Sequence, residues 1–568
     1  MKSFIFITFA KFKLYDPNHT INMKINRHFV GFSLIVGLLL SSCQSKVDLI
    51  VHNANVYTLG QNNLKASAFV VDDGKFVDVG GEELLEQYTA KKVLDLQELP
   101  VYPGFIDSHC HFLSLGLSLN KVDLIGTKSF EDVLDRVKRY ATNKELNAIT
   151  GRGWDQNDWK IKRLPNKEQL DLLFPDIPVA LRRIDGHAML VNQKALDLAG
   201  ITLDTEVTGG QIVKENGKLT GVLIDAPMQM VTNILPKPSV EDKIKSLQDA
   251  EEISFANGLT TVSVAGLDRE DIFLIDSLHK TGALTIRVYA MISNSQDNVD
   301  YFLKEGPYKT DKLNVRSFKV YADGALGSRG AALKDSYSDL DNHTGAFITS
   351  KDSLEALAYK LAASPFQMNT HAIGDAANQV VLEAYNKALV FSDDPRWRVE
   401  HAQIIDTNDI KLFNRKILPS VQPTHATSDM YWAEDRLGED RLYGAYANKA
   451  LLEQSGRIAL GTDFPVEDVN PFKTFYAAVV RKDSEAFPEE GYLPENKLSE
   501  IEALKGMTIW GAYANFEDKE KGSIEAGKVA DFIILDRDII KVSEKRILKT
   551  RVVATLVDGK IVYSNRIN

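Results

Sequence analysis

The middle of the chain alternates between short apolar segments and segments with helical periodicity, and this alternation constrains the fold more than any other feature. Such an order is typical of a parallel α/β fold, because consecutive parallel strands need a crossover connection. Helical patterns such as "EDIFLIDSLHK" and "SLEALAYKLAA" separate most of the apolar segments. The eight candidate strands are "VYPGFIDSHCH" (101–111), "GLTTVSVAG" (258–266), "LTIRVYAMI" (284–292), "RSFKVYADG" (316–324), "FQMNTHAIGD" (366–375), "RWRVEHAQ" (396–403), "ILPSVQPTH" (417–425) and "RIALGTDFP" (457–465). Eight such units predict a (β/α)₈ TIM-type barrel, which we place at residues 101–515.

Both chain ends and one long gap fall outside this repeat. Residues 47–100 and 516–568 hold β-rich segments separated by turn residues, including Asp-Gly pairs typical of hairpins. These two ends predict one small β-sandwich. The gap between the first and second candidate strands is far too long for one helix and its loops. We therefore expect an insertion over the barrel mouth at about residues 125–240.

The N-terminal segment has the pattern of a secretory signal. From Met23 the chain reads "MKINRHFVGFSLIVGLLLSSC", with basic residues, an apolar run and small residues in order. The stretch "LSSC" resembles a bacterial lipobox, so residues 1–43 are interpreted as a signal peptide, Met23 as the true start and Cys43 as the lipidated residue. A transmembrane anchor is the alternative, but roughly 12 apolar residues fall short of the about 20 that a span needs. This interpretation predicts a lipid-anchored protein of the bacterial cell envelope that faces the periplasm.

Composition excludes several classes of function. The formal net charge of −11 argues against a nucleic-acid partner, because phosphate binding needs a basic face. Two cysteines, Cys43 and Cys110, exclude a disulfide framework. The chain has no H-E-x-x-H, no phosphate-binding G-x-x-x-x-G-K-[ST] and no G-x-S-x-G. The histidines and carboxylates are therefore the candidates for a functional site.

Two histidines, His109 and His111, stand one residue apart at the end of the first candidate strand. They share one face of that strand, because side chains alternate along it. A barrel gathers its strand ends in a ring, which would bring other polar strand-end residues to the same point. Those residues are Lys319, His371, His401, His425 and Asp463. One histidine at a strand end is more often a hydrogen-bonded core residue, but several in register favour a zinc-type divalent metal site.

Nine motifs follow one another from the first candidate strand to the C-terminal region. They are "PGFIDSHCHF", "GRGWDQNDW", "RRIDGHAMLVNQKAL", "KVYADGALGSR", "THAIGDAAN", "VEHAQ", "VQPTHATSD", "GTDFPVEDVNPF" and "GSIEAGKVADFIILD". Together they resemble the amidohydrolase superfamily, metal-dependent hydrolases built on a (β/α)₈ barrel. Within it the chain is similar to the YtcJ-like branch, amidohydrolase family 3, which includes N-substituted formamide deformylase. The resemblance covers nearly all of the chain after the signal.

The resemblance implies a set of metal ligands. His109 and His111 would bind a first metal together with Asp463, and His371 and His401 would bind a second. Lys319 falls where many superfamily members carry a carbamylated lysine that bridges two metals. A carbamate is anionic, whereas an ammonium beside two cations would be repelled. The alternative is a lysine paired with Asp323, in which case the site holds one metal. Zinc is the default metal.

Catalytic and substrate roles also follow from the resemblance. Asp463 would act as the acid/base, while His425 would bind the developing oxyanion or serve only as a structural residue. From the insertion, Trp154, Asp155 and His187 would contact the substrate, with Trp159 in the insertion core. Substrate contacts of this kind have a plainer alternative, which is packing and capping within the insertion.

After the lysine strand, Arg329 would bind a substrate carboxylate or remain solvated. The predicted function is hydrolysis of a non-peptide C–N bond in a small-molecule amide, an N-acyl or N-formyl amine. The alternative functions are cyclic-amide hydrolysis, deacetylation and a non-catalytic role as a lipid-anchored binding protein. A homodimer is compatible with the sequence as the oligomeric state.

Overall fold

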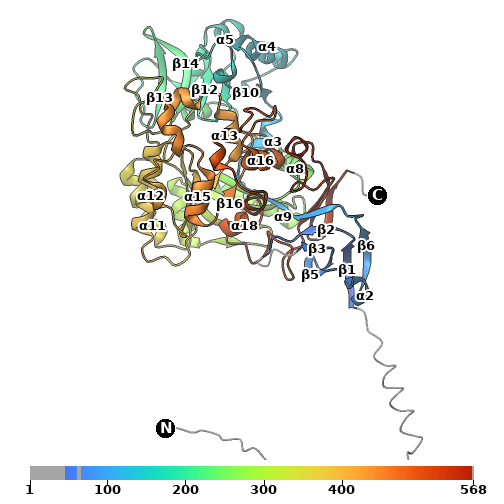
Figure 1. Cartoon of the computed structure of the whole chain (residues 1–568). Helices are drawn as coiled ribbons and strands as arrows, with labels where there is room; N and C mark the ends of the chain where they lie inside the picture. Colours follow the sequence, from blue (N-terminus) through green and yellow to red (C-terminus); the bar gives the residue numbers. More distant parts are fainter. Residues whose placement is uncertain (1–44, 61–64, 566–568) are drawn as a thin grey trace, which may run out of the picture. The chain divides into compact units, whose positions relative to one another are not determined.

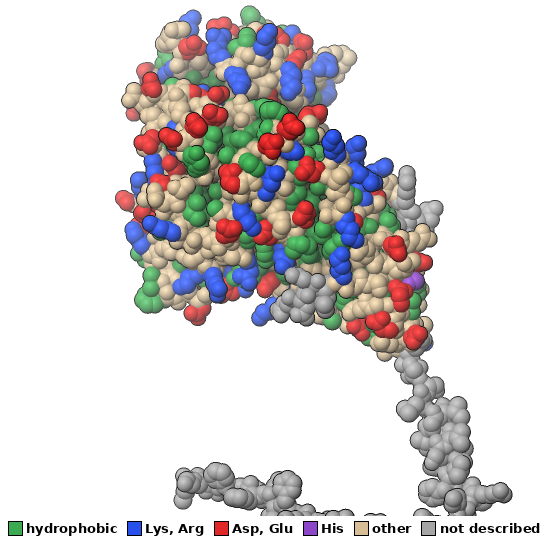
Figure 2. Space-filling model, viewed as in Figure 1, with side chains coloured by type: hydrophobic (Ala, Val, Ile, Leu, Met, Phe, Trp, Pro, Cys, Tyr) green, Lys and Arg blue, Asp and Glu red, His purple; other side chains and the backbone are tan. Residues whose placement is uncertain are grey.

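The computed structural model describes residues 45–60 and 65–565. The predicted signal peptide, with Met23 and the lipidation site Cys43, lies outside these residues. Within the described part, no helix is both long enough and apolar enough to cross a membrane. On the face shown in Figure 2, basic and acidic side chains are interspersed.

The central sheet contains eight parallel strands in barrel order, which confirms the predicted (β/α)₈ barrel. Figure 1 shows the helices α9, α11, α12, α15 and α18 around this sheet. In ring order the strands are β8 (Phe105–Cys110), β15 (Leu259–Leu267), β16 (Arg287–Ser293), β18 (Leu313–Tyr321), β19 (Gln367–Ala372), β20 (Trp397–His401), β21 (Ile417–Val421) and β22 (Ala459–Leu460). A short strand, β17 (Tyr308–Lys309), pairs antiparallel with β18. Each of the eight candidate segments contributes one of the eight ring strands.

The first and last strands meet where the ring closes. The hydroxyl of Thr462 donates to Asp107 Oδ2 at 2.7 Å, and the backbone N–H of Asp463 donates to the carbonyl of His109 at 2.8 Å. The backbone N–H of His111 donates to the carbonyl of Phe464, also at 2.8 Å. Closure therefore places the loop after β22 directly against the end of β8.

Helices follow the barrel strands and cover the sheet. In α9, for example, Ile272, Ile275 and Leu278 form the buried face, and the helix is capped by the following residue, Gly282, with φ of +72°. The helices of the barrel region are α3 (Phe112–Ser118), α8 (Val240–Ala256), α9 (Arg269–Thr281), α10 (Gln296–Glu305), α11 (Lys351–Ala362), α12 (Asp375–Ala388), α13 (Pro423–Asp429), α14 (Ala433–Leu437), α15 (Asn448–Ser455), α16 (Pro471–Val480), α17 (Glu500–Gly506) and α18 (Ile509–Ala514), with short 3₁₀ turns at Ile410–Leu412, Glu439–Gly444 and Pro494–Asn496.

The segment between β8 and α8 forms a separate six-stranded sheet with its own helices (teal and green in Figure 1). Its strands, in sheet order, are β13 (Gly210–Glu215), β14 (Lys218–Asp225), β12 (Ala188–Val191), β11 (Val179–Arg183), β10 (Ile149–Trp154) and β9 (Val122–Asp123). Its helices are α4 (Phe130–Ala141), α5 (Glu168–Leu173), α6 (Gln193–Ala199) and α7 (Met228–Thr232), with a 3₁₀ turn at Gln156–Asp158. The first strand begins at Val122, slightly before the expected boundary.

Two further sheets combine segments from both ends of the chain. One contains β5 (Lys75–Gly80), β4 (Ala68–Asp72), β1 (Ser45–His52) and β6 (Tyr88–Asp95), with α2 (Leu84–Gln87) beside it. The other contains β25 (Lys560–Ser564), β24 (Val552–Val557), β23 (Phe532–Leu535), β7 (Pro100–Pro103), β2 (Asn55–Tyr57) and β3 (Lys65–Ala66), and α19 (Glu544–Ile547) lies between β23 and β24 in the chain. Both sheets contribute to one apolar core, in which Phe69 packs edge-on against Phe76 and Phe532.

One sequence-based boundary differs from the structure. The segment "VYPG" was assigned to the first barrel strand, but β7 (Pro100–Pro103) pairs with β23 and β2 in the terminal sheet. The backbone N–H of Gly104, at the junction, donates to the carbonyl of Asp531 at 2.9 Å. The barrel strand β8 therefore begins only at Phe105.

Candidate metal centre

A cavity of about 810 Å³ lies between the carboxyl ends of the barrel strands and the inserted sheet. Strand-end residues of the barrel line one side of it, and residues of β10, β11 and the loop after β11 line the other. This is the position that active sites take in (β/α)₈ barrels. The sequence-predicted site residues that line the cavity are His111, Asp155, His187, Lys319, His371, His401, His425 and Asp463.

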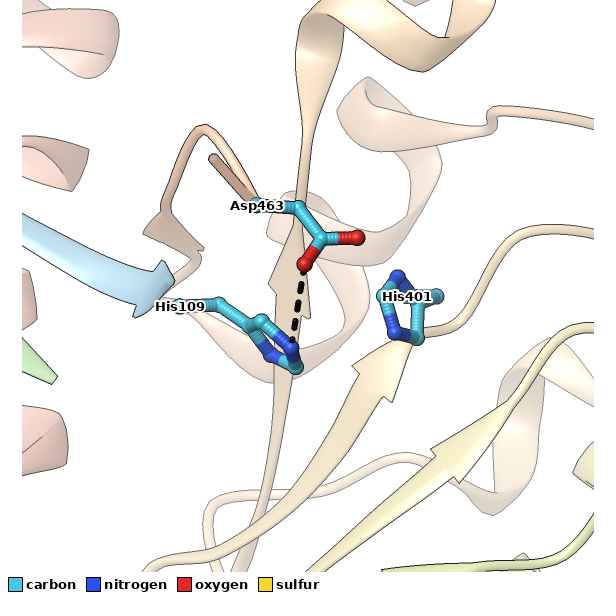
Figure 3. A group of neighbouring side chains, drawn as sticks. All are labelled: His109, His401 and Asp463. Carbon is cyan, nitrogen blue, oxygen red and sulfur yellow. Dashed lines mark ion pairs between the residues drawn. The ribbon is translucent and has the colours of Figure 1, made fainter. Parts of the chain in front are cut away.

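His109, His401 and Asp463 form a compact group of possible metal ligands (Figure 3). One donor atom from each lies within 4.8 Å of the others, and all three residues are buried. His109 comes from β8, His401 ends β20, and Asp463 follows β22. Nε2 of His109 is 3.6 Å from Oδ1 of Asp463. Segments far apart in the sequence thus place two imidazoles and one carboxylate around a single point.

His109 is held so that Nε2 faces this point. Its Nδ1 lies 2.5 Å from Oε2 of Glu400, which is itself ion-paired with Arg398 at 2.7 Å. Burial, with the nearby Lys319, lowers the pKa of His109 to about 4. The imidazole is therefore neutral near pH 7, which is the form that binds a metal. Burial would raise the pKa of Glu400, but Arg398 and His109 lower it to about 2.

His401 is oriented in the same way. Its Nδ1 is 2.7 Å from Oε1 of Gln422, so Nε2 is the nitrogen left for a ligand. Burial and the neighbouring imidazoles of His371 and His109 lower its pKa well below the usual value. Neutral imidazoles with one nitrogen anchored by a protein acceptor are the usual form of metal-binding histidine.

Asp463 supplies a buried carboxylate that points into the group. Its Oδ1 accepts no hydrogen bond from the described residues and lies 3.2 Å from Nε2 of His111. Burial would raise its pKa, but His111, His425 and His109 lower it well below the usual value. A buried, ionised oxygen this close to Nε2 of both His109 and His111 fits a divalent cation of the zinc type.

Two of these residues adopt a backbone conformation that is rare for residues with a side chain. His401 has φ of +70° and Asp463 has φ of +63°. A left-handed backbone at such residues costs about 1–2 kcal/mol and is concentrated at functional sites. Their neighbours, including the hydrogen bond from Asp463 N–H to His109, hold both side chains toward the cavity.

Lys319 is buried next to the group. Its Nζ lies 3.1 Å from Nε2 of His109, and burial lowers its pKa to about 8 despite the nearby carboxylates of Glu400 and Asp463. Asp323, the alternative partner, instead accepts backbone hydrogen bonds from Ala332, Ile373 and Gly374. The lysine is thus placed among the candidate ligands and not in a structural ion pair with Asp323.

His371 extends the cluster toward the insertion. Its ring centroid lies 4.5 Å from that of His401 and 5.0 Å from that of His187. Nδ1 of His187 is 2.6 Å from Oδ1 of Asp225, also in the insertion. The inserted sheet therefore brings its own anchored imidazole to the metal-facing side of the cavity.

His425 lies in the first turn of α13, and not at a strand end as expected. The helix begins at Pro423 directly after β21, since proline is favoured at the first helical position. Nε2 of His425 is 3.4 Å from Oδ2 of Asp463, and Nδ1 is 3.0 Å from Oε1 of Glu467. Burial would lower its pKa, but these two carboxylates raise it to about 10. The side chain is therefore a cationic donor beside Asp463.

Two predicted substrate contacts lie elsewhere. Trp154 is buried in the core of the inserted sheet together with Trp159, and its indole N–H donates to the carbonyl of Leu181 at 2.7 Å. Arg329 forms an ion pair with Asp339 at 2.8 Å and does not line the cavity. Asp155 does line it, but its carboxylate is paired with Arg183. Trp154 and Arg329 therefore do not line the cavity.

Several residues of the site escaped the sequence analysis. Glu400, Gln422 and Glu467 anchor the three histidines described above. The sequence does give one indication for Glu400. An acidic side chain within the predicted barrel strand "RWRVEH" would be buried and would need a polar or charged partner. Gln422 and Glu467 lie next to loops, and nothing in their sequence context points to a histidine far away in the chain.

A parallel barrel whose strand ends gather neutral imidazoles and a buried carboxylate defines a metal-dependent hydrolase. The chain belongs to the amidohydrolase family, whose model matches residues 92–563. It is 31% identical to the putative amidohydrolase YtcJ of Bacillus subtilis (strain 168), over 90% of this chain and 99% of that protein. It is 27% identical to N-substituted formamide deformylase of Arthrobacter pascens, over 91% of this chain and 98% of that enzyme. An uncharacterized metal-dependent hydrolase from Pyrococcus horikoshii OT3 superposes with a TM-score of 0.71 at 28% identity, covering 87% of this chain and 99% of that one.

Proposed function

We propose that the protein hydrolyses a non-peptide C–N bond in an N-acyl or N-formyl amine. The observation that carries this proposal is the buried group of His109, His401 and Asp463, with Lys319 beside it. The similarity to N-substituted formamide deformylase along most of both chains supports the bond type. Substrate choice depends on the loops and the insertion, and these vary independently of the barrel.

The residues that would hold a zinc-type metal are His109, His111 and Asp463 for one ion and His371 and His401 for another. Lys319, whose Nζ lies 3.1 Å from His109 Nε2, would be a further anionic ligand after carbamylation. When bound, such a metal supplies a Lewis acid that activates water near neutral pH and polarises an amide carbonyl.

The protein's own groups would then move the protons. Asp463 faces His109 and His111 with one oxygen and His425 with the other, so it can accept a proton from the attacking water and deliver it to the departing nitrogen. The cationic His425 can donate a hydrogen bond to the negative charge that develops on the carbonyl oxygen. Residues of the inserted sheet line one side of the cavity and can position the substrate there.

The test compares wild-type protein with Asp463→Asn on a panel of N-acyl and N-formyl amines, with bound metal measured per chain. We expect turnover to fall by at least about 1,000-fold while metal content falls only in part. Asp300→Asn, on the exposed side of α10, is the matched control and should retain wild-type turnover. Wild-type turnover by Asp463→Asn would reject the acid/base role, and no turnover of any amide by metal-loaded wild type would reject the function.

We further propose that Cys43 is lipidated and anchors the enzyme to the bacterial envelope, facing the periplasm. The support is the "LSSC" stretch after an apolar run. Cys43→Ser should move the protein from the membrane fraction to the soluble fraction.

A further inference from the structure

Two arginines of the inserted sheet lie side by side on the wall of the cavity. Arg152 of β10 and Arg182 of β11 are direct partners in the register of these parallel strands, and both line the cavity. Neighbouring strands are only about 4.8 Å apart, so partnered residues project together from the sheet. The two guanidinium groups therefore face the cavity as a pair.

A β-bulge directs Arg152 to this position. The register between β10 and β11 shifts between Arg152 and Trp154, and Gly153 within the bulge has φ of +114°. Trp154 turns into the apolar core of the insertion, whereas Arg152 remains at the cavity. Bulges commonly re-aim side chains next to active sites.

Neither arginine has an acidic partner among residues 45–60 and 65–565. Arg152 donates from Nη2 to the carbonyl of Ile184 at 2.8 Å, and its buried Nε has no acceptor in the described part of the chain. Arg182 makes no side-chain hydrogen bond to the described residues. Asp185, the nearby acidic residue, is ion-paired with Arg183 at 2.6 Å.

This arrangement is unfavourable unless an anion joins it. Like charges directly opposite on neighbouring strands destabilise a sheet. Burial and Arg182 lower the pKa of Arg152 to about 10, against the opposing effect of Asp463 and Asp185. An arginine pair presents parallel N–H donors that match a carboxylate in bidentate geometry.

We infer that Arg152 and Arg182 bind a carboxylate carried by the substrate. The substrate class is then an N-acyl or N-formyl amine with a free carboxylate, such as an N-acylated amino acid, and this deepens the function proposed above. The cavity that holds the arginines is continuous with His401 and Asp463, and its volume of about 810 Å³ accommodates such a molecule. The carboxylate would lie against the inserted sheet and the amide at the barrel rim.

A binding measurement tests the anion site without turnover. The probes are phenylacetate and phenylethanol, a carboxylate and a neutral alcohol of similar size, titrated by calorimetry into metal-loaded wild type, Arg152→Gln, Arg182→Gln and the double variant. We expect each single substitution to weaken phenylacetate binding about 10-fold and the double variant about 100-fold. Phenylethanol binding should not change. Unchanged phenylacetate binding in the double variant would place the carboxylate elsewhere and overturn the inference.

Lys473→Gln is the matched control for loss of a cation. Lys473 also lines the cavity, but it is already paired with Asp468 at 2.6 Å, so phenylacetate binding should stay within about twofold. Thermal unfolding checks the fold: removing one of two like charges should leave the melting temperature of Arg182→Gln unchanged or raise it. A melting temperature that falls, with binding of both probes lost together, would mark the pair as structural.

Turnover separates this inference from the proposed function. Wild type should hydrolyse N-acetylphenylalanine with a higher kcat/KM than its primary amide, and the double variant should lose that preference. If wild type hydrolyses neither compound but phenylacetate binding still depends on both arginines, the proposed amide hydrolysis is wrong and the carboxylate site at Arg152 and Arg182 is supported. If both compounds are hydrolysed equally well by all variants, the anion site fails and the hydrolase stands.

Discussion

Oε2 of Glu400 lies 2.5 Å from Nδ1 of His109, and both side chains are fully buried. The contact joins β20 to β8 across the interior of the barrel, although the residues are 291 positions apart in the chain. It fixes which nitrogen of His109 faces Asp463, because the carboxylate binds the other one. Glu400 also lies next to His401 in sequence, so one strand supplies a candidate ligand and the anchor of another.

The first prediction concerns this anchor. Replacing Glu400 with glutamine removes the negative charge that orients His109 and increases its basicity. We expect Glu400→Gln to weaken metal binding about 10- to 100-fold, measured by competition with a chelator. Glu355→Gln, at a partly exposed position of α11 that is paired with Lys387, should leave the metal affinity unchanged. Wild-type affinity in Glu400→Gln would mean that His109 needs no anchor.

Lys319 gives a second prediction, which tests the proposed carbamate. Metal loading in buffers freed of carbon dioxide and bicarbonate should reduce the bound metal from roughly two ions per chain toward one, because the bridging anion cannot form. Added bicarbonate should restore it. Lys319→Gln should show the lower stoichiometry under both conditions, and Lys360→Gln, exposed on α11, should behave as wild type. If the number of metal ions bound per wild-type chain does not depend on bicarbonate, the carbamate at Lys319 is contradicted.

The barrel could be predicted because its strands are apolar runs that alternate with segments of helical periodicity. β15, for instance, is buried along almost all of its length, which explains its continuous pattern "LTTVSVAGL". The convergence of His109, His401 and Asp463 followed from the barrel geometry together with the resemblance. Predicting that these residues converge required only the order of the strands, and no detail of the loops.

Other features depended on local backbone geometry that no periodic pattern contains. Trp154 was assigned to the cavity, but the bulge at Gly153 reverses the alternation and sends it into the core. His425 was placed at a strand end, although Pro423 marks the start of a helix. The carboxylate Glu400 and the arginines described above were missed because their roles arise from contacts between distant segments.

A third prediction tests the role of His425. Loss of its cationic donor should lower kcat about 100-fold, because the charge on the carbonyl oxygen in the transition state loses a hydrogen bond. We expect His425→Gln to retain its bound metal, since the side chain contacts Asp463 Oδ2 and not the group around Oδ1. His52→Gln, in the terminal sheet, is the matched control for turnover. A purely structural His425 would instead lower the melting temperature and leave kcat near the wild-type value.

The fourth prediction concerns pH and stability at a site remote from the metal centre. His279 of α9 donates from Nε2 to the carbonyl of Ile286 at 2.9 Å, and burial, with Lys312 and Arg287 nearby, lowers its pKa to about 4. In the unfolded chain the pKa is about 6.5, so the unfolded state takes up the proton first as the pH falls. The neutral side chain therefore contributes fully to the free energy of unfolding above about pH 6.5. That stabilisation is lost as the pH falls to about 4. Between about pH 7.5 and about pH 4.5, the free energy of unfolding should fall by about 1–2 kcal/mol more in wild type than in His279→Gln, measured by urea denaturation. Parallel pH profiles for the two proteins would show that protonation of His279 has no part in the acid instability.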